Sequence, residues 1–170
     1  MIDILKELKP FFEDNYRRIN VREYARIMKI SPPTASILLK RFLKEGLLKK
    51  EIDKQYMYYF ANKENAIFIG LSRIYWLSYF KSSGLIDLFE KELVSPVVIL
   101  FGSLSKAETK IDSDIDLAIF TSSKNELNLN EFENKLKRKI QLFKFKSRED
   151  VTNKELLNNI LDGYLLVGRW

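Results

Sequence analysis

The sequence predicts an α+β protein built from two domains and a helical connector. Apolar residues recur at helical spacing in the first segment, and the pattern then changes to the alternation typical of a strand hairpin. From residue 95 onward, buried strands alternate with amphipathic helices. We therefore expect a helical domain ending in a hairpin over residues 1–62, a connector over 63–94, and a small mixed β-sheet with flanking helices over 95–170.

Two residue types are missing from the chain, and their absence narrows its chemistry. None of the 170 residues is a cysteine or a histidine. Disulfides and thiolate metal sites are therefore excluded, and the commonest general base and transition-metal ligand are not available. Any metal must be held by oxygen ligands, which favours magnesium, manganese or calcium.

The positive charge is concentrated in the first half of the chain. The net charge is +6, and residues 1–95 contain 17 Lys and Arg against 12 Asp and Glu, whereas residues 96–170 contain 12 against 11. This asymmetry favours a polyanionic partner for the N-terminal half, although a solvated lysine-rich surface explains it equally well. Because no long uncharged apolar run or apolar leader is present, we expect a cytoplasmic protein without a membrane partner.

The N-terminal elements follow from helix-start and helix-stop signals. A first helix is expected over Ile2–Phe12, ending beyond Pro10 or kinked by it. Asn20 is a candidate N-cap of a second helix, and Ser31 is the candidate N-cap of a third that ends at Gly46. The second and third helices are therefore expected to be short and joined by a tight turn.

A hairpin and a connector follow these helices. Residues 47–53 and 55–62 alternate as two strands around Asp53-Lys54. Residues 64–84 are expected to form a long aromatic-rich helix and residues 85–93 a short amphipathic one. The aromatic side chains of the long helix are a candidate dimer surface, with core packing the favoured interpretation.

The last segment alternates between strands and helices. We expect strands at Val97–Phe101, Ile115–Thr121 and Ile140–Lys146, helices at 127–139 and Asn153–Leu161, and an edge strand at 163–168.

The motif that carries chemistry is 101-FGSLSKAETKIDSDIDLAIF-120. Asp114 and Asp116 are two residues apart at the head of a strand, so their carboxylates project side by side and repel each other. A magnesium or manganese ion that also carries substrate phosphates would hold them together. Gly102 and Ser103 at the preceding strand end suit a phosphate tail, and Lys106 is a candidate phosphate contact. The plain alternative is a polar turn that caps a strand.

The sequence has Gly-Ser, then ten residues, then Asp-x-Asp, with 113-SDIDLAIF-120 as the strand. This arrangement resembles the signature of the minimal nucleotidyltransferases of the DNA polymerase β superfamily. The resemblance covers about residues 95–168 and is closest to the antitoxin type. It implies a magnesium-dependent enzyme that transfers a nucleoside monophosphate from a nucleoside triphosphate, with ATP expected, to a hydroxyl. It further implies a protein tyrosine or serine, such as one on a toxin partner, as the acceptor, and a small molecule is the other option.

Two positions depart from that family's pattern. Ala107 stands where the family commonly has glycine. The family also places a third carboxylate on a later strand, where this chain has Gln141 or Lys144, while Glu149 and Asp150 lie just past the strand. The alternative function is therefore a DNA-binding regulator whose degenerate second domain binds nucleotide without turnover.

The segment from residue 20 to 62 resembles the winged helix-turn-helix domains of transcription regulators. The resemblance implies that the third helix enters the major groove of DNA. Thr34 and Ser36 would lie at base edges, and Lys40, Arg41, Lys44 and Lys50 would contact phosphates. Such domains also serve as protein-interaction modules, and winged regulators usually act as homodimers. Helix-start chemistry alone is the other explanation of Thr34 and Ser36.

Overall fold

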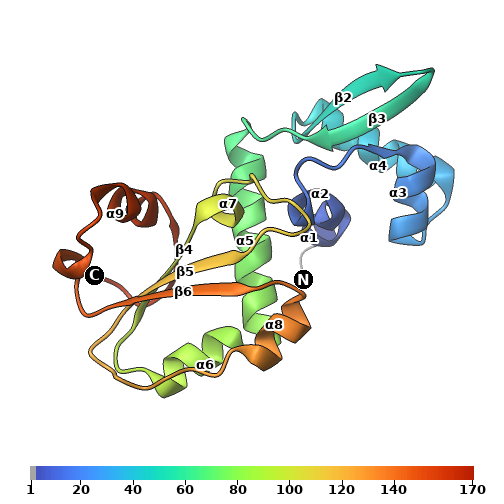
Figure 1. Ribbon diagram of the computed structural model, residues 1–170. Coiled ribbons are helices and arrows are strands. Elements are labelled where there is room, and N and C mark those ends of the chain that lie inside the picture. Colours follow the sequence, from blue (N-terminus) through green and yellow to red (C-terminus); the bar gives the residue numbers. More distant parts are fainter. Residues whose placement is uncertain (1–2) are drawn as a thin grey trace. The chain divides into compact units, whose positions relative to one another are not determined.

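The computed structural model describes residues 3–170, so Ile2, where the first expected helix begins, lies outside the described residues. Contacts divide the chain into two compact units. Unit 1 contains the described residues up to Ser72 together with Ala107–Ile111, and unit 2 contains Arg73–Lys106 and Asp112–Trp170. Figure 1 shows the order of the elements along the chain.

Unit 1 consists of helices and a three-stranded sheet. Its elements are α1 (Asp3–Glu7), α2 (Lys9–Glu13), β1 (Ile19–Asn20), α3 (Val21–Met28), α4 (Pro32–Lys44), β2 (Leu48–Asp53), β3 (Tyr56–Ala61) and the first part of α5 (Ala66–Ser83). The first expected helix is broken in two, and Pro10 lies in the first turn of the second piece, where a missing N–H costs nothing.

Side-chain caps set the starts of α3 and α4. The Asn20 side chain accepts a hydrogen bond from the backbone N–H of Glu23 at 3.0 Å, and Ser31 accepts one from Thr34 at 3.3 Å. Each cap satisfies a donor that the helix itself leaves free. Both caps are at the positions predicted from the sequence.

The sheet of unit 1 contains the expected hairpin and one strand that was not expected. β2 and β3 pair antiparallel, and their order in the sheet is β1-β3-β2. β1 is only two residues long and pairs with β3 through Ile19 and Tyr59. A strand this short has no periodic sequence pattern, and it is defined only by its pairing with β3.

Unit 1 also includes a short segment from far along the chain, residues 107–111. The backbone N–H of Asn15 donates to the carbonyl of Thr109 at 2.8 Å, and the N–H of Thr109 donates to the side-chain oxygen of Asn15 at 2.6 Å. The amide nitrogen of Asn15 donates to the carbonyl of Phe11. Asn15 and Thr109 are both buried, so these hydrogen bonds fix the segment inside unit 1.

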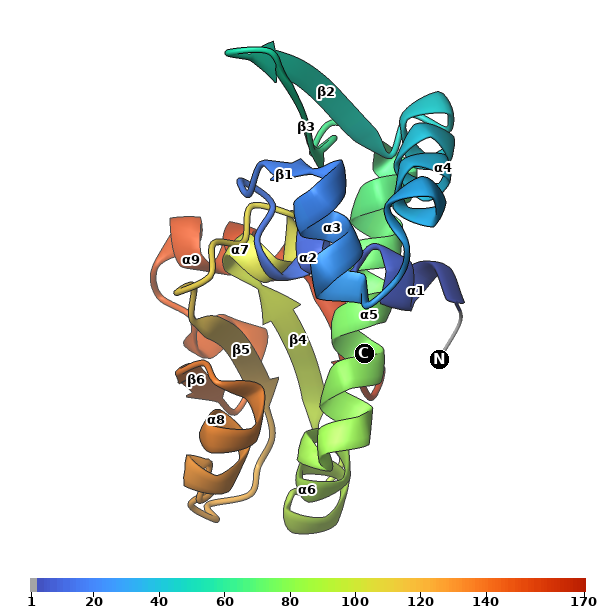
Figure 2. The same cartoon turned by 90° about the vertical axis from the view of Figure 1, so that its right-hand side faces the viewer.

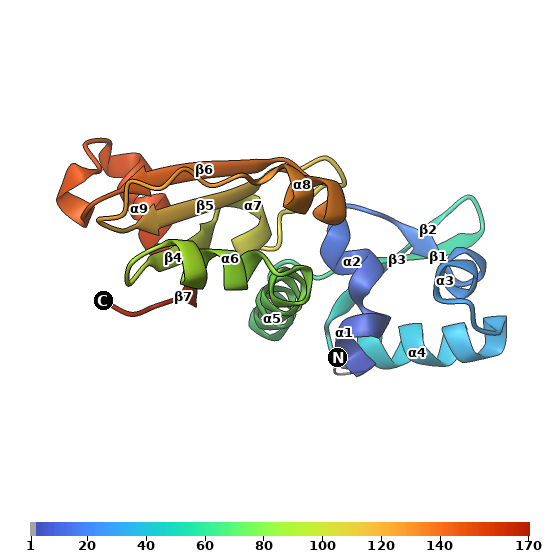
Figure 3. The same cartoon turned by 90° about the horizontal axis from the view of Figure 1, so that it is seen from below.

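Unit 2 is built around a four-stranded sheet. After the remainder of α5 come α6 (Leu85–Glu92), β4 (Val97–Phe101), α7 (Gly102–Ser105), β5 (Ile115–Phe120), α8 (Asn130–Leu136), β6 (Ile140–Phe145), the 3-10 turn η1 (Arg148–Asp150), α9 (Lys154–Leu161) and β7 (Tyr164–Val167). The strand order is β6-β5-β4-β7. β4 is antiparallel to β5 and β7, while β5 and β6 are parallel and lie side by side in Figure 3. The mixed sheet and the edge position of the last strand agree with the sequence prediction.

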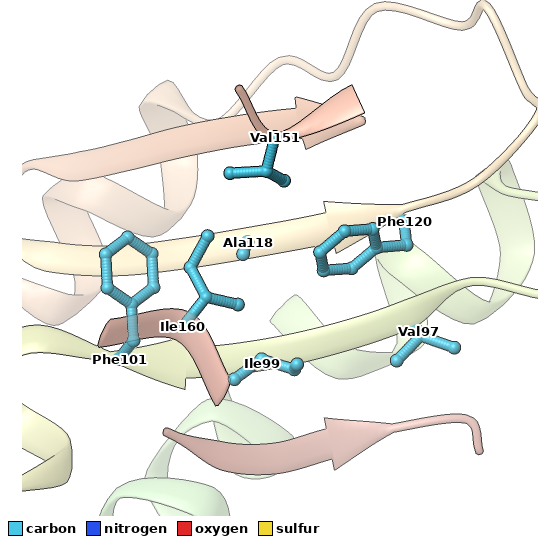
Figure 4. Close-up of a cluster of buried hydrophobic side chains, with 7 residues drawn as sticks. All are labelled: Val97, Ile99, Phe101, Ala118, Phe120, Val151 and Ile160. Atoms are coloured by element: carbon cyan, nitrogen blue, oxygen red, sulfur yellow. The ribbon is translucent and has the colours of Figure 1, made fainter. Parts of the chain in front are cut away.

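One face of this sheet carries an apolar cluster. Its buried members are Val97, Ile99, Phe101, Ala118, Phe120, Val151 and Ile160. Alternate residues of β4 and β5 point to this face, and Ile160 covers them from α9 (Figure 4). Gly163 allows the chain to pass close to β4 after α9, because a Cβ there would lie 2.6 Å from the carbonyl of Leu100.

The aromatic residues of α5 serve as core. Phe68, Tyr75, Trp76 and Phe80 are at most 1% exposed, so they are not available as an open surface. Among residues 3–170 there is no helix with the length and apolar character needed to cross a membrane.

Candidate functional site

The candidate site begins where β4 ends. Figure 2 shows β4 running directly into α7, and Gly102 lies at this junction with a positive φ of 68°. Its neighbour Phe101 pairs with Asp116 across the sheet. A Cβ at residue 102 would lie 2.2 Å from the Oδ2 atom of Asp116, well inside contact distance. The Asp116 carboxylate therefore lies directly against the glycine backbone.

The two carboxylates affect each other electrostatically. Asp116 is the second residue of β5 and Asp114 immediately precedes the strand. Burial raises the pKa of Asp116 above its usual value, and the negative charge of Asp114 raises it further. The site therefore disfavours the ionised form of Asp116 and would gain from a bound cation.

Gln141 is the residue beside the aspartate pair on the neighbouring strand. β6 runs parallel to β5 with Gln141 in register with Asp116. The amide nitrogen of Gln141 donates a hydrogen bond to the Oδ2 atom of Asp114 at 2.7 Å. This contact partly offsets the crowding of negative charge.

The other residues considered for this position lie elsewhere. Lys144 pairs with Ile119 further along the strands and donates to the carbonyl of Asn125 at 2.8 Å. Glu149 and Asp150 belong to the 3-10 turn beyond the far end of β6. No register shift is present that would bring their carboxylates to the aspartate pair.

Arg138 holds the loop that presents Asp114, and sequence reasoning missed it. Its Nη1 atom donates to the carbonyl of Ser113 at 2.6 Å, and the residue is only 9% exposed. The N–H of Ile115 donates to the carbonyl of Lys139 at 2.8 Å. Arg138 lies in a segment predicted as part of a longer helix, so no signal in the sequence marked it.

The phosphate-side residues are arranged around α7. This helix starts at Gly102. Ser103 is half-buried next to the glycine, and the Nζ atom of Lys106 donates to the Oδ1 atom of Asn159 on α9 at 2.6 Å. Gly102 thus lies against Asp116, with Ser103 next to it in the chain, whereas the Lys106 side chain is directed to α9.

The donor set fits a hard divalent cation that shares its shell with phosphate and water. Two adjacent carboxylates, one of them with a raised pKa, are the ligands magnesium commonly uses together with substrate phosphates. Within residues 3–170 no group of three or more acidic, cysteine or histidine side chains is placed to hold a metal. The protein would therefore supply two carboxylates and the substrate the remaining oxygen ligands.

The residues proposed for nucleic-acid contact lie on α4 and β2 of unit 1. Lys40, Lys44 and Lys50 are exposed and form no salt bridge within the described chain. Arg41 forms a salt bridge with Glu7. Thr34 is exposed and shares a hydrogen bond with the hydroxyl of Ser31 at 2.8 Å, whereas Ser36 is half-buried. Thr34 thus has the helix-start role, while the three lysines are open to solvent.

Comparison with known proteins supports the interpretation of unit 2. A family model described as "Polymerase beta, Nucleotidyltransferase" matches residues 84–169, just over half of the chain. The match includes Gly102, both aspartates and all four strands of the second sheet. No curated protein and no solved structure matches the chain.

Replacing Gly102 tests the close approach to Asp116. Gly102→Ala should lower the free energy of unfolding by about 1–3 kcal/mol, because a side chain at positive φ costs about 1–2 kcal/mol and the Asp116 carboxylate must also move. Gly70→Ala is the matched control, since nothing lies within 4 Å of a Cβ there and a helical alanine should stabilise by up to about 1 kcal/mol. Urea unfolding measures both. Equal effects would contradict the geometry.

Removing the charge of Asp116 should change stability in opposite directions with and without metal. At pH 7 in chelator, Asp116→Asn should stabilise, because the raised pKa means that the ionised carboxylate is unfavourable in the folded state. This advantage should shrink as the pH falls and the wild-type carboxyl becomes protonated. With magnesium at ten times its dissociation constant, only the wild type should gain about 1.4 kcal/mol.

Thermal unfolding across pH, with and without magnesium, measures this effect. Asp112→Asn is the control, because Asp112 is exposed and lies two residues before the pair. A destabilised Asp116→Asn variant in chelator, or equal magnesium stabilisation of both proteins, would contradict the argument.

Proposed function

Because the chain belongs to the polymerase β nucleotidyltransferase family, we propose that its domain over residues 95–170 transfers a nucleoside monophosphate from a nucleoside triphosphate, ATP being the expected one, to a hydroxyl. The observation that carries the proposal is the contact between the backbone of Gly102 and the carboxylate of Asp116. The glycine backbone at the end of β4, which would bind phosphate, lies next to one of two potential metal ligands.

Each residue has a distinct role in this proposal. Asp114 and Asp116 would hold magnesium, which neutralises phosphate charge during transfer when it is bound. The backbone at Gly102 and the hydroxyl of Ser103 would bind the phosphate tail. Lys106 would contribute a phosphate contact by exchanging its hydrogen bond with Asn159 for one with the substrate.

The acceptor hydroxyl is proposed to belong to a protein, such as a toxin partner, or to a small molecule. Unit 2 has nearly balanced charge in the sequence after residue 95, so an extended RNA strand is a weaker candidate for the acceptor. Gln141 favours a second function, in which the domain binds nucleotide and metal without turnover. An amide at this position adds no charge to the metal site and offers a weaker ligand than a carboxylate.

The N-terminal part, residues 1–62, is proposed to be a winged helix-turn-helix domain that binds DNA in a regulator of transcription. The succession of α3, α4 and the hairpin of β2 and β3 supports this, as do the exposed lysines on α4 and β2. Lys40 and Lys44 are one helical turn apart on α4, and Lys50 is on the first strand of the hairpin. Their ammonium groups would contact phosphates and orient the domain. Because such regulators usually act as homodimers, we also propose a homodimer.

A link between the two activities is supported by the placement of residues 107–111. This segment lies between the Gly-Ser and Asp-x-Asp parts of the site in the sequence, yet its contacts place it in unit 1. The paired hydrogen bonds between Asn15 and Thr109 hold it there. A ligand that shifts the chain on either side of the segment would therefore act on the packing of unit 1.

Turnover of labelled nucleoside triphosphates with magnesium tests the catalytic proposal. The wild type should release pyrophosphate, and Asp114→Asn and Asp116→Asn should each abolish the release. Gln141→Glu should raise turnover and magnesium affinity by about tenfold or more, because it adds a carboxylate next to the pair. Gln55→Glu, in the hairpin turn of unit 1, is the control for the added charge. Metal-dependent binding without pyrophosphate release would favour the regulator instead.

Duplex binding at several salt concentrations tests the N-terminal proposal. Lys40→Ala and Lys50→Ala should weaken binding to all sequences, and each should reduce the salt slope by about 1 because one phosphate contact is lost. Lys124→Ala, an exposed lysine of unit 2, should change neither quantity. Arg41→Ala should also weaken binding, but it removes the salt bridge to Glu7 as well, so its stability must be measured separately. Unchanged slopes would indicate a protein-docking role.

A further inference from the structure

Unit 2 contains a cavity of about 600 Å³ at the end of its sheet opposite the aspartate pair. Its walls come from the start of β4, the end of β5, the turn after β6 and the last residues of the chain. Phe120 and Val97 mark this end of the sheet and Phe101 marks the other (Figure 4). Phe120 is four residues from Asp116 along β5, about 13 Å at the rise of a strand. The cavity is therefore separate from the aspartate site.

The chain end is held over this cavity by a tight backbone contact. Gly168 has a positive φ of 80°, and a Cβ there would lie 2.2 Å from the carbonyl oxygen of Pro96. The edge-on contact of Trp170 with Phe120 has a centroid distance of 4.9 Å, and the guanidinium of Arg148 lies 3.5 Å from the indole centroid. Trp170 is nevertheless 55% exposed. The contacts with Phe120 and Arg148 fix the orientation of the indole, and its solvent-exposed part can stack on a planar ligand.

Three cationic side chains, Lys146, Arg148 and Arg169, line the cavity. Glu149 is the one acidic side chain among the lining residues, and the α-carboxylate of Trp170 and the neighbouring Asp150 add negative charge. None of the three cations forms a salt bridge anywhere in residues 3–170. The Oδ2 atom of Asp150 accepts the backbone N–H groups of Lys146 and Ser147 instead. The three cationic side chains are therefore available as hydrogen-bond donors to an anionic ligand.

We propose that this cavity binds a nucleoside phosphate, with the base stacked on Trp170 and the phosphate held by Lys146 and Arg169. The unpaired cationic side chains favour an anion, and the oriented indole beside them favours a planar group. The volume lies within the range of small-molecule sites, about 300–1,000 Å³. None of the residues of the proposed transferase site lines this cavity.

The same chemistry has two sources, a free mononucleotide or one nucleotide of a single strand. Both present a base next to a phosphate, and the cavity residues recognise those two groups. The experiment below includes both as ligands. The plain alternative is that the cations are merely solvated and that Trp170 only covers Phe120.

Tryptophan fluorescence gives a direct measurement, because the chain has two tryptophans and Trp76 is fully buried. The full chain is titrated in chelator, so that no metal is available to the aspartate pair. AMP and a short single-stranded oligonucleotide are the ligands, with adenosine and inorganic phosphate as partial ligands. We expect saturable quenching by AMP, by the oligonucleotide or by both, and at least about fivefold weaker binding of each partial ligand.

Variants assign the contacts. Trp170→Ala should weaken binding of labelled AMP in equilibrium dialysis by about 5- to 150-fold, the equivalent of one stacked base. Lys146→Gln and Arg169→Gln should each weaken AMP several-fold and leave adenosine unchanged. Lys154→Gln, an exposed lysine outside the cavity, is the control and should bind as the wild type does.

Asp116→Asn separates this site from the proposed transferase, since the variant should lose turnover and keep the quenching. Tighter binding of the oligonucleotide than of AMP would identify the strand as the source. The proposal is overturned if neither nucleotide quenches, if inorganic phosphate binds as tightly as AMP, or if Trp170→Ala binds AMP with unchanged affinity.

Discussion

The close approach of the Asp116 carboxylate to the backbone of Gly102 is the constraint on which the rest of the site depends. The antiparallel pairing of β4 with β5 brings Phe101 opposite Asp116, so the residue after Phe101 must have no side chain. A positive φ at that residue then turns the chain into α7. The absence of a Cβ at residue 102 therefore allows β4 to end there and the backbone of α7 to begin. It also leaves room for a phosphate to come near the aspartates.

Gln141 shows how the site tolerates its own charge. The raised pKa of Asp116 reflects burial first and the negative charge of Asp114 second. A third carboxylate on β6 would bind metal more strongly and would make the metal-free fold less stable. The Gln141 amide instead stabilises the metal-free fold, because it donates a hydrogen bond to Asp114. The same residue therefore favours folding without metal and weak metal binding, which is the property expected of a slow enzyme or of a nucleotide sensor.

Sequence reasoning succeeded where the signal was local. Asn20 and Ser31 cap helices through residues three positions away, and the apolar runs of β4 and β5 are continuous because both strands are buried. It failed where the partner is distant. The choice between Gln141 and Lys144 depends on the register of β6 against β5, which no single strand contains. β1 exists only because β3 pairs with it, and Arg138 reaches a carbonyl 25 positions away.

The backbone conformation of Ala107 depends both on the residue itself and on contacts with a distant part of the chain. The family commonly has glycine here, and the positive φ of 55° explains why. An alanine in this conformation costs about 1–2 kcal/mol, of which burial of its methyl group returns about 0.8 kcal/mol. The remainder is offset by neighbours, and the adjacent segment has them in the two hydrogen bonds between Asn15 and Thr109. Strain at residue 107 therefore persists because the contacts and hydrogen bonds of its segment within unit 1 hold the backbone in this conformation.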